Sequence, residues 1–588
     1  MVRRSVALLV PTSLHRVREW IEQRDWDEGA TLMVFGAIIG AVSGLAVVGF
    51  YRLIDLSHFL LIQLPESHLP IVGQALYAPV LTGIGLWAAW FVVHRTDIPP
   101  GQNVPDVQLA IAKRNGVIRS GPVAIRTIAS AITLGSGGSA GSEGPVAVLS
   151  AALGSSIGRR LRFQPRHLKI LVGCGAAAGI AGAFNAPFAG AFFALEEVLG
   201  SFSVGAFSPV VIASVVGALT VRPFLGAQPI FASAKPASTR PLDILLYPAL
   251  GIACGLVSAI YARLYLGAGA LGTRLRGPRW LWPLVAGGIV GLIVLASRNL
   301  LAGNGHLAIP DPIFGRLAWY ALLGITAGKI VATAVTLGFG GSGGVFTPTL
   351  FIGAALGGGL GVLGAIVFPG FVDPQAWAFV GMAGMVAGAT RAPLTAIFMV
   401  FEMTDDYTYV VPLMVVAVIA YTTARRYSAH GLYDGWLAAR GEHLSHGVDQ
   451  SLMDHTHVAD AIDRTVPTVA SDASIDELVN AAHESKHGVL PVTDPDGTLV
   501  GLISHHVLRE AIVSRGDLDP VVLAADLAEP VDALSPRDTL RRALAVMNAR
   551  GVDAVPVVES SGDGARFAGL LSRADVLLVY ERALSQAV

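Results

Sequence analysis

Long runs without a charged residue decide what this chain can fold into. A helix needs about 20 predominantly apolar residues to cross a bilayer, and most of the runs are close to that length. Only 14% of the residues are charged, whereas soluble domains carry about 25%. The sequence therefore predicts a polytopic α-helical membrane protein. The uncharged runs are 31–51, 71–93, 170–195, 198–221, 244–262, 280–297, 330–372 and 407–424. Because 330–372 is too long for one span, we expect it to hold two segments or a broken one.

The remaining composition excludes several classes of protein. A net charge of −1 gives no reason to expect nucleic-acid binding. Cys174 and Cys254 are the only cysteines and both lie in apolar runs, so they indicate neither a disulfide framework nor a metal cluster. The apolar part contains no recognisable nucleophile–base pair, and we do not expect an enzyme. No cleavage site follows the short apolar stretch 5–11, so no signal peptide is expected.

A glycine-rich stretch places one carboxylate inside the apolar sequence. Residues 135–145 read Gly-Ser-Gly-Gly-Ser-Ala-Gly-Ser-Glu-Gly-Pro, and Glu143 is the charged residue. A charge in hydrocarbon is costly and marks a functional site by default. Gly/Pro loops at 101–105 and 344–348 also stand at predicted helix boundaries, where backbone N–H groups attract anions. We expect Glu143 to block an anion path when ionised and to open it when protonated, which needs no cofactor.

An internal repeat is visible at an offset of 206 residues. The stretch 135–138 matches 341–344, and 175–196 matches 381–402, with Pro and Glu in register. Repeated halves with Gly/Pro-interrupted segments predict a transporter or channel with its site near the midplane. The first matched half ends in Glu196–Glu197. We expect one to face inward as a proton acceptor and the other to be satisfied by nearby backbone or a partner side chain; the alternative is that both are interfacial and solvated. Lys329 is expected to be structural or to snorkel.

Charges return after about residue 445, where two similar units follow. The first contains His487-Gly-Val-Leu-Pro491 and then Gly501-Leu-Ile-Ser504; the second contains Val552-Asp-Ala-Val-Pro556 and then a second Gly-Leu-Leu-Ser stretch. Each places a helical stretch before two short strands and another helix after them. The order helix–strand–strand–helix therefore appears twice, which predicts a tandem α/β pair.

Three motifs carry a family resemblance. Gly141-Ser-Glu143-Gly-Pro145, Gly344-Val-Phe346-Thr-Pro348 and Phe184-Asn-Ala-Pro187 together resemble the CLC chloride channel/antiporter family, and the tandem unit resembles the paired CBS domains that follow many CLC membrane domains. The resemblance implies a homodimer in the cell membrane, with an anion pathway in each subunit, inverted repeats, broken helices and cytoplasmic CBS domains. The expected parts are a cytoplasmic amphipathic segment 1–30, a membrane domain 31–440, a linker 441–450, and CBS domains 451–515 and 516–588.

The resemblance also implies roles for single residues. Glu143 matches the external gating glutamate, and Glu197 matches the internal proton glutamate kept by antiporters. The backbone amides of Val345 and Phe346 match the central anion donors, and Tyr433 matches the tyrosine whose hydroxyl faces the anion, although an interfacial aromatic is the alternative. These matches favour chloride/proton antiport regulated by the CBS pair.

Two departures leave alternatives open. Gln102 stands where the family usually has a serine that contacts the anion, and Ser142 stands where it usually has a basic residue. A passive voltage- or pH-gated anion channel with broken proton coupling is therefore the alternative. In the CBS pair, Ser572 and Asp575 fit a pattern that resembles adenine-nucleotide binding, whereas the first unit has Val507 in place of the acid. A purely structural CBS pair is the alternative to regulation, and a nucleotide-sensing membrane protein is the alternative of another class.

Overall fold

The structure is a computed structural model. It describes residues 28–66, 71–95, 104–227, 243–304, 317–442, 453, 456–513, 522–561 and 564–587. Most of the predicted amphipathic segment 1–30, and Gln102 of the first Gly/Pro loop, lie outside the described residues. The chain divides into two compact units, 1–444 and 445–588, and each is considered by itself.

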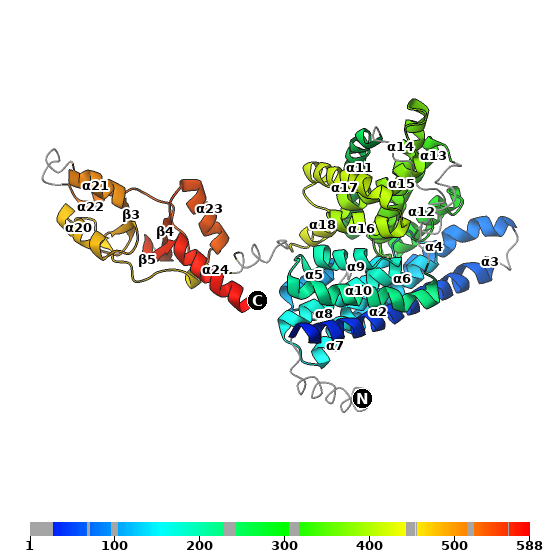
Figure 1. Ribbon diagram of the computed structural model, residues 1–588, viewed down its shortest axis with the longest axis horizontal. Coiled ribbons are helices and arrows are strands. Elements are labelled where there is room, and N and C mark those ends of the chain that lie inside the picture. The colour runs from blue at the N-terminus through cyan, green and yellow to red at the C-terminus, as the bar shows by residue number, and fades with distance from the viewer. Residues whose placement is uncertain are drawn as a thin grey trace. The chain divides into compact units, whose positions relative to one another are not determined.

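The first unit is a bundle of helices (Figure 1). Eight helices in the described ranges are long and apolar enough to cross a membrane. The uncharged run 330–372 is broken at 339–345, as predicted. The elements are α2 (Glu28–His58), a π-helical turn (Phe59–Gln63), α3 (Leu64–Glu66), α4 (Ile71–His94), α5 (Val104–Lys113), α6 (Ser120–Gly135), α7 (Glu143–Arg160), α8 (Pro165–Phe184), α9 (Pro187–Phe193), the π-helix η2 (Ala194–Leu199), α10 (Val204–Leu225), α11 (Tyr247–Arg274), α12 (Leu281–Ala296), α13 (Trp319–Gly338), α14 (Phe346–Val367), α15 (Pro374–Thr390), α16 (Pro393–Thr404), α17 (Val410–Tyr427) and α18 (Leu432–Ala438).

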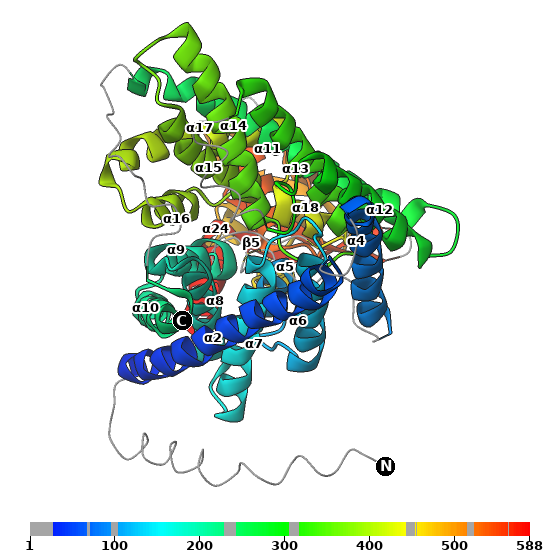
Figure 2. The same ribbon diagram turned by 90° about the vertical axis from the view of Figure 1, so that its right-hand side faces the viewer.

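The two repeats form two groups of helices. Figure 2 shows α2 and α6–α10, blue to teal, apart from α11 and α13–α17, green to yellow. The loop before α7 meets the loop before α14 through reciprocal hydrogen bonds. The Ser139 N–H donates to Thr336 Oγ1, and the Ser342 N–H donates to Thr133 Oγ1, both at 3.1 Å. Each residue contacts the counterpart of its partner, so a two-fold relation links the repeats.

The register of these loops corrects the sequence analysis. Reciprocal residues differ by 203 positions (342 − 139 = 203), whereas the sequence match of 135–138 with 341–344 assumed 206, and is wrong. From the first residue of α7 to that of α9 is 44 positions (187 − 143), and from α14 to α16 it is 47 (393 − 346). The second repeat therefore has three more residues within this stretch than the first. The offset of 206 positions holds only after these extra residues.

In the part of the repeats where the offset is 206, one glutamate from each repeat binds the backbone of the other repeat. Glu402 accepts hydrogen bonds from the N–H groups of Phe188 (3.0 Å) and Ala189 (2.8 Å), in the first turn of α9. Glu196 accepts from the N–H groups of Leu394 (3.1 Å) and Thr395 (2.7 Å), in the first turn of α16. Each carboxylate satisfies donors that a helix start leaves unpaired. We call this pair of contacts the glutamate exchange; it confirms that one residue of the Glu196–Glu197 pair is satisfied by backbone.

Lys329 is a structural residue of α13. It is fully buried, and its Nζ donates to the carbonyl oxygens of Leu301 (3.1 Å) and Gly303 (2.9 Å). The ammonium also lies 5.2 Å from the centre of the Phe351 ring, within cation–π range. Carbonyl oxygens and a ring face therefore satisfy the charge, and Lys329 does not snorkel.

The second unit contains the predicted tandem. Its first half has a three-stranded sheet in the order β1-β2-β3, with β1 parallel and β3 antiparallel to β2, and its second half has the antiparallel pair β4-β5. The predicted order helix–strand–strand–helix is confirmed in both halves. The elements are β1 (Val469–Ala470), α20 (Ile475–Glu484), β2 (Val489–Thr493), β3 (Leu499–Ser504), α21 (His505–Val513), α22 (Ala524–Leu527), α23 (Leu540–Arg550), β4 (Ala554–Ser561), β5 (Gly564–Ser572) and α24 (Arg573–Ala587).

Candidate functional site

The site in the membrane unit is built where the two glycine loops touch. Gly141 and Gly344 form an isolated antiparallel bridge in which each N–H donates to the other's carbonyl oxygen at 2.7 Å. Two residues beyond each glycine a helix begins, α7 at Glu143 and α14 at Phe346. The bridge therefore holds two helix N-termini close together inside the protein.

The Glu143 carboxylate lies at the N-terminus of α14. Its Oε1 accepts a hydrogen bond from the Phe346 N–H at 2.6 Å, and its Oε2 accepts one from the Thr347 hydroxyl at 2.6 Å. The residue is only 1% exposed. Helix N-termini bind anions through free N–H groups and the helix dipole, and a carboxylate is such an anion. Glu143 thus occupies the kind of position at which the sequence predicted an anion.

Two glycines are required for this geometry. A Cβ added to Gly141 would lie 2.1 Å from Glu143 Oε1, and one added to Gly344 would lie 2.2 Å from the same atom. Real Cβ contacts are not that short, so any side chain at either position would displace the carboxylate. Both glycines of the bridge therefore make room for the Glu143 carboxylate, through the close backbone approach that glycine permits.

The predicted anion donors fare differently. Phe346 supplies its N–H to Glu143, whereas Val345 takes part through its carbonyl oxygen, which accepts from the Thr349 hydroxyl at 2.6 Å and from the Thr349 N–H at 3.1 Å. Sequence reasoning missed Thr347. A hydroxyl residue in the first turn of a helix that meets an anion was the signal available. The Phe346 ring packs against Phe184, with centroids 6.0 Å apart.

Tyr433 is buried in α18, at 5% exposure, and interacts electrostatically with both Glu197 and Glu143. The charges of the two acids predicted to act in the same pathway thus both act on one buried tyrosine. Its burial differs from the exposure that an interfacial aromatic residue would have. Tyr261 of α11 is also within electrostatic reach of Glu143.

The adjacent glutamates of η2 face different surroundings. Glu196 takes part in the glutamate exchange, whereas Glu197 is 6% exposed and meets Gln108 of α5. Gln108 Nε2 donates to the Glu197 carbonyl oxygen at 2.7 Å and to its Oε2 at 3.3 Å. The hydrogen bonds of Glu197 and those of Glu143 go to different residues, and the two acids are not bonded to each other. Sequence analysis singled out Glu197 but not Gln108, whose partner is 89 residues away.

Ser142 has a hydroxyl neighbour in place of a charge. The hydroxyl oxygens of Tyr51, in α2, and Ser142 are 3.2 Å apart, and the Tyr51 hydroxyl also donates to the Ala183 carbonyl oxygen at 3.3 Å. A neutral hydrogen bond therefore stands beside Glu143 where the family usually has a basic side chain. This contact joins α2 to the loop that leads to Glu143.

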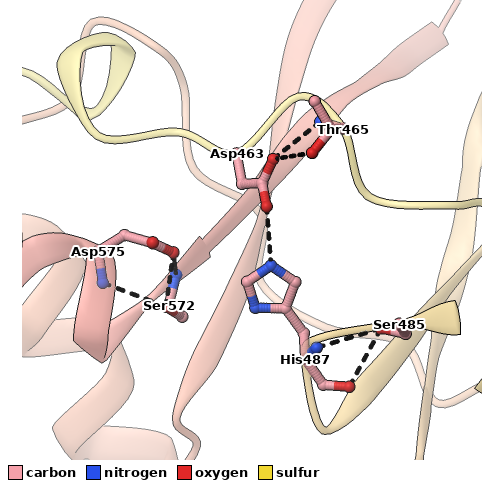
Figure 3. Close-up of polar contacts among 6 residues, drawn as sticks. All are labelled: Asp463, Thr465, Ser485, His487, Ser572 and Asp575. Atoms are coloured by element: carbon pink, nitrogen blue, oxygen red, sulfur yellow. Dashed lines mark hydrogen bonds and ion pairs between the residues drawn. The ribbon is translucent and has the colours of Figure 1, made fainter. Parts of the chain in front are cut away.

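The second unit has its own polar cluster (Figure 3). Ser572 N–H (3.1 Å) and Oγ (2.5 Å) donate to Asp575 Oδ2. Nearby, Asp463 accepts from the Thr465 N–H (2.9 Å) and hydroxyl (2.7 Å) and meets His487 Nε2 at 3.1 Å. The Thr465 hydroxyl is the main cause that lowers the pKa of Asp463 to about 2.

The two halves of this unit differ at the predicted nucleotide position. In the first half the Ser504 hydroxyl accepts from the Val507 N–H at 3.2 Å, with no carboxylate at that position. The second half has Asp575 there, and Leu570 of β5 pairs with the backbone of Asp463 from the segment before β1. Of the two halves, the second therefore has the Ser–Asp pair that the predicted nucleotide pattern needs.

Comparison with known proteins places the chain. Residues 84–425 match the profile of the voltage gated chloride channel family, and 458–514 and 524–582 each match the CBS domain. The chain belongs to the CLC family. It is 33% identical over 418 residues to a putative chloride channel protein ClcB-like of Ralstonia nicotianae, covering 69% of this chain and 96% of that protein. It is 30% identical over 421 residues to the H(+)/Cl(−) exchange transporter ClcA of Yersinia pseudotuberculosis, covering 69% and 87%.

Solved CLC structures share the fold. The crystal structure of a slow cyanobacterial Cl−/H+ antiporter covers 70% of this chain and 97% of its own, with a TM-score of 0.65 at 24% identity. A eukaryotic CLC transporter covers 96% and 98%, with a TM-score of 0.61 at 19% identity. The protein is thus a multi-pass membrane protein of a family of anion transporters, not of enzymes, with two CBS domains.

Proposed function

We propose that this CLC protein exchanges chloride for protons, with Glu143 as the gate. The observation that supports this most is the Glu143 carboxylate at the N-terminus of α14, bound by one N–H and one hydroxyl. Neutral donors suit a permeating monovalent anion, because they replace its hydration without holding it too tightly. The relatives described as H(+)/Cl(−) exchange transporters make chloride the first anion to test.

The proposed cycle uses few groups. Ionised Glu143 occupies the donors of Phe346 and Thr347 and blocks the path. Protonation removes the charge that binds it there, so the side chain leaves and chloride takes the same donors. Tyr433 offers its hydroxyl further along, and the proton exchanges with the interior by way of Glu197. One carboxylate thereby couples the two ions without a cofactor.

Uphill proton movement tests the proposal. In liposomes with an imposed chloride gradient, the wild type is expected to move protons against their own gradient. Glu143→Gln is expected to abolish proton movement and to retain chloride flux. The matched control is Glu402→Gln, a membrane-unit glutamate outside the path, which should keep coupling. If Glu143→Gln altered neither flux, the role of Glu143 would be wrong.

A passive anion channel is the second candidate. It is favoured by Gln102 at the usual serine position and by the neutral Tyr51–Ser142 contact beside the gate. A longer amide and a missing positive charge would both loosen the hold on chloride. Chloride flux without uphill proton movement in the wild type would select this reading.

The CBS pair is proposed to lie in the cytoplasm and to regulate transport, with an adenine nucleotide at Ser572 and Asp575. Arg425 and Arg426 lie in the last turn of α17, which precedes the CBS pair in the chain. Basic residues favour the cytoplasmic side of a membrane. Titrating the full-length protein with ATP, ADP and AMP, beside Asp575→Ala, tests binding. Binding unaffected by this substitution, or no binding at all, would leave the purely structural pair.

A homodimer is proposed for the membrane unit. Large apolar side chains are exposed on α9, α10, α16 and α17, among them Phe188 (58%), Phe207 (44%), Leu394 (39%) and Met414 (52%). Such a patch suits a partner subunit. Cross-linking between cysteines introduced at these positions tests it, with exposed Leu292 of α12 as the control position.

A further inference from the structure

Gln108 holds Glu197 by a side-chain amide whose orientation is fixed. Gln108 is 4% exposed, and its Nε2 lies 2.7 Å from the Glu197 carbonyl oxygen and 3.3 Å from Glu197 Oε2. Both partners are acceptors in the ionised residue, so the NH2 group must face them. The amide oxygen, Gln108 Oε1, consequently takes part in neither contact.

That oxygen is buried without a donor. Gln108 Oε1 receives no hydrogen bond from the part of the chain that the structure describes. A buried amide oxygen left unsatisfied costs about 1–3 kcal/mol, and native proteins satisfy such atoms with ordered water. The side chain therefore presents a water-binding acceptor beside a buried acid.

The surroundings suit proton transfer. Asp434 and Glu196 interact electrostatically with Glu197, and so does Tyr433. Helix α5 packs against η2 and α18. Gln108 is buried in the middle of this helix. Lys113, its last residue, is exposed and pairs with Glu442. Less than two turns of helix thus separate Gln108, which binds the buried acid, from exposed Lys113.

We propose that Gln108 Oε1 holds a water molecule that passes protons between the interior solution and Glu197. Because Gln108 already occupies Glu197 Oε2, the proton binds Glu197 Oε1. The water breaks one of its O–H bonds as the Glu197 O–H bond forms, and it recovers a proton from the solution side; release runs in reverse. The inference rests on the proposed proton coupling, and Gln108 is a positioning residue that acts through Glu197 and the water.

Gln108→Met tests this role, because Met has a similar length and no amide. Proton flux is expected to fall about tenfold, the scale of one hydrogen bond to an ionisable group, while chloride flux stays within about twofold. The control is Ser155→Ala, which also removes a buried hydrogen-bonding group, between Ile118 N–H and the Gly116 carbonyl oxygen, without touching Glu197. An unchanged proton-to-chloride ratio in Gln108→Met would overturn the proposal.

An infrared measurement separates this inference from the proposed function. The C=O stretch of protonated Glu197, identified by its loss in Glu197→Gln, should shift in Gln108→Met and not in Ser155→Ala. A role in packing alone would leave this band in place. If the wild type moved no protons uphill, the antiport proposal would fail, and the band would still decide the contact: a shift supports it and no shift overturns it.

Discussion

The first residues of α7 and α14 are counterparts in the two repeats, and they do opposite things. Glu143 and Phe346 are 203 positions apart, like the reciprocal Ser139 and Ser342 beside them. The flanking contacts are symmetric, yet one repeat supplies a carboxylate and the other supplies the N–H that binds it. The difference teaches that duplication built the scaffold, whereas the chemistry depends on a position where the copies diverged.

The contact of Glu143 with the start of α14 should be disrupted most completely when the space beside the carboxylate is filled. In Gly141→Ala the new Cβ must displace the Glu143 carboxylate and thus both of its hydrogen bonds. Each bond to a charged group contributes about 1.5–3 kcal/mol, so the gate equilibrium should shift by about a hundredfold or more. Chloride flux at neutral pH should rise and lose its pH dependence in liposome assays. Gly121→Ala, whose Cβ would meet nothing within 4 Å, should behave as the wild type.

Thr347→Val sharpens the same comparison with a smaller change. It removes the hydroxyl that binds Glu143 Oε2 and leaves the Phe346 N–H in place. The gate should open about tenfold more readily at a given pH, measured as a shift of the flux–pH curve toward higher pH. Thr127→Val, which removes a hydroxyl bonded only within its own helix (to the Val123 carbonyl oxygen), is the control. Equal curves for both variants would mean that Thr347 does not hold the gate.

The symmetric contacts should respond symmetrically. Glu196→Gln and Glu402→Gln each weaken a carboxylate that caps the other repeat, so each should lower the free energy of unfolding by about 1–2 kcal/mol. Glu196→Gln should be slightly more costly, because the Thr395 hydroxyl also donates to Glu196, at 2.7 Å. Thermal unfolding in detergent measures both. A markedly larger loss in Glu402→Gln would contradict the equivalence of the two caps.

The smallest effect is expected in the second unit, whose halves also differ. The pKa of Asp463 is lowered to about 2, below the roughly 3.9 of an unfolded chain. Its stabilisation is therefore present above about pH 4 and is lost as the pH falls toward 2. Asp463→Asn should cost about 1 kcal/mol at neutral pH, and the difference from wild type should vanish over that window. Urea unfolding followed by circular dichroism checks it, and a difference that persisted at pH 2 would exclude this cause.

The sequence predicted the break in the run 330–372, the glycine-rich loop that leads to Glu143 and the tandem α/β unit, because local patterns and glycine motifs carry them. It misplaced the loop register, because Gly135-Ser-Gly-Gly138 and Gly138-Ser-Ala-Gly141 are nearly self-similar, and only tertiary contacts show which glycine meets Gly344. Thr347 and Gln108 were missed for a related reason. Their roles depend on where Glu143 and Glu197 point, which no spacing along the chain reveals.

The bridge between Gly141 and Gly344 has a consequence for motion. Two short backbone hydrogen bonds join the segment that carries the gate to the segment that carries its donors. The repeats cannot separate there without breaking both bonds between two buried glycines. If Glu143 gates a path here as proposed, the path opens by rotation of one side chain, and the opening extends over the reach of a glutamate rather than the travel of a domain.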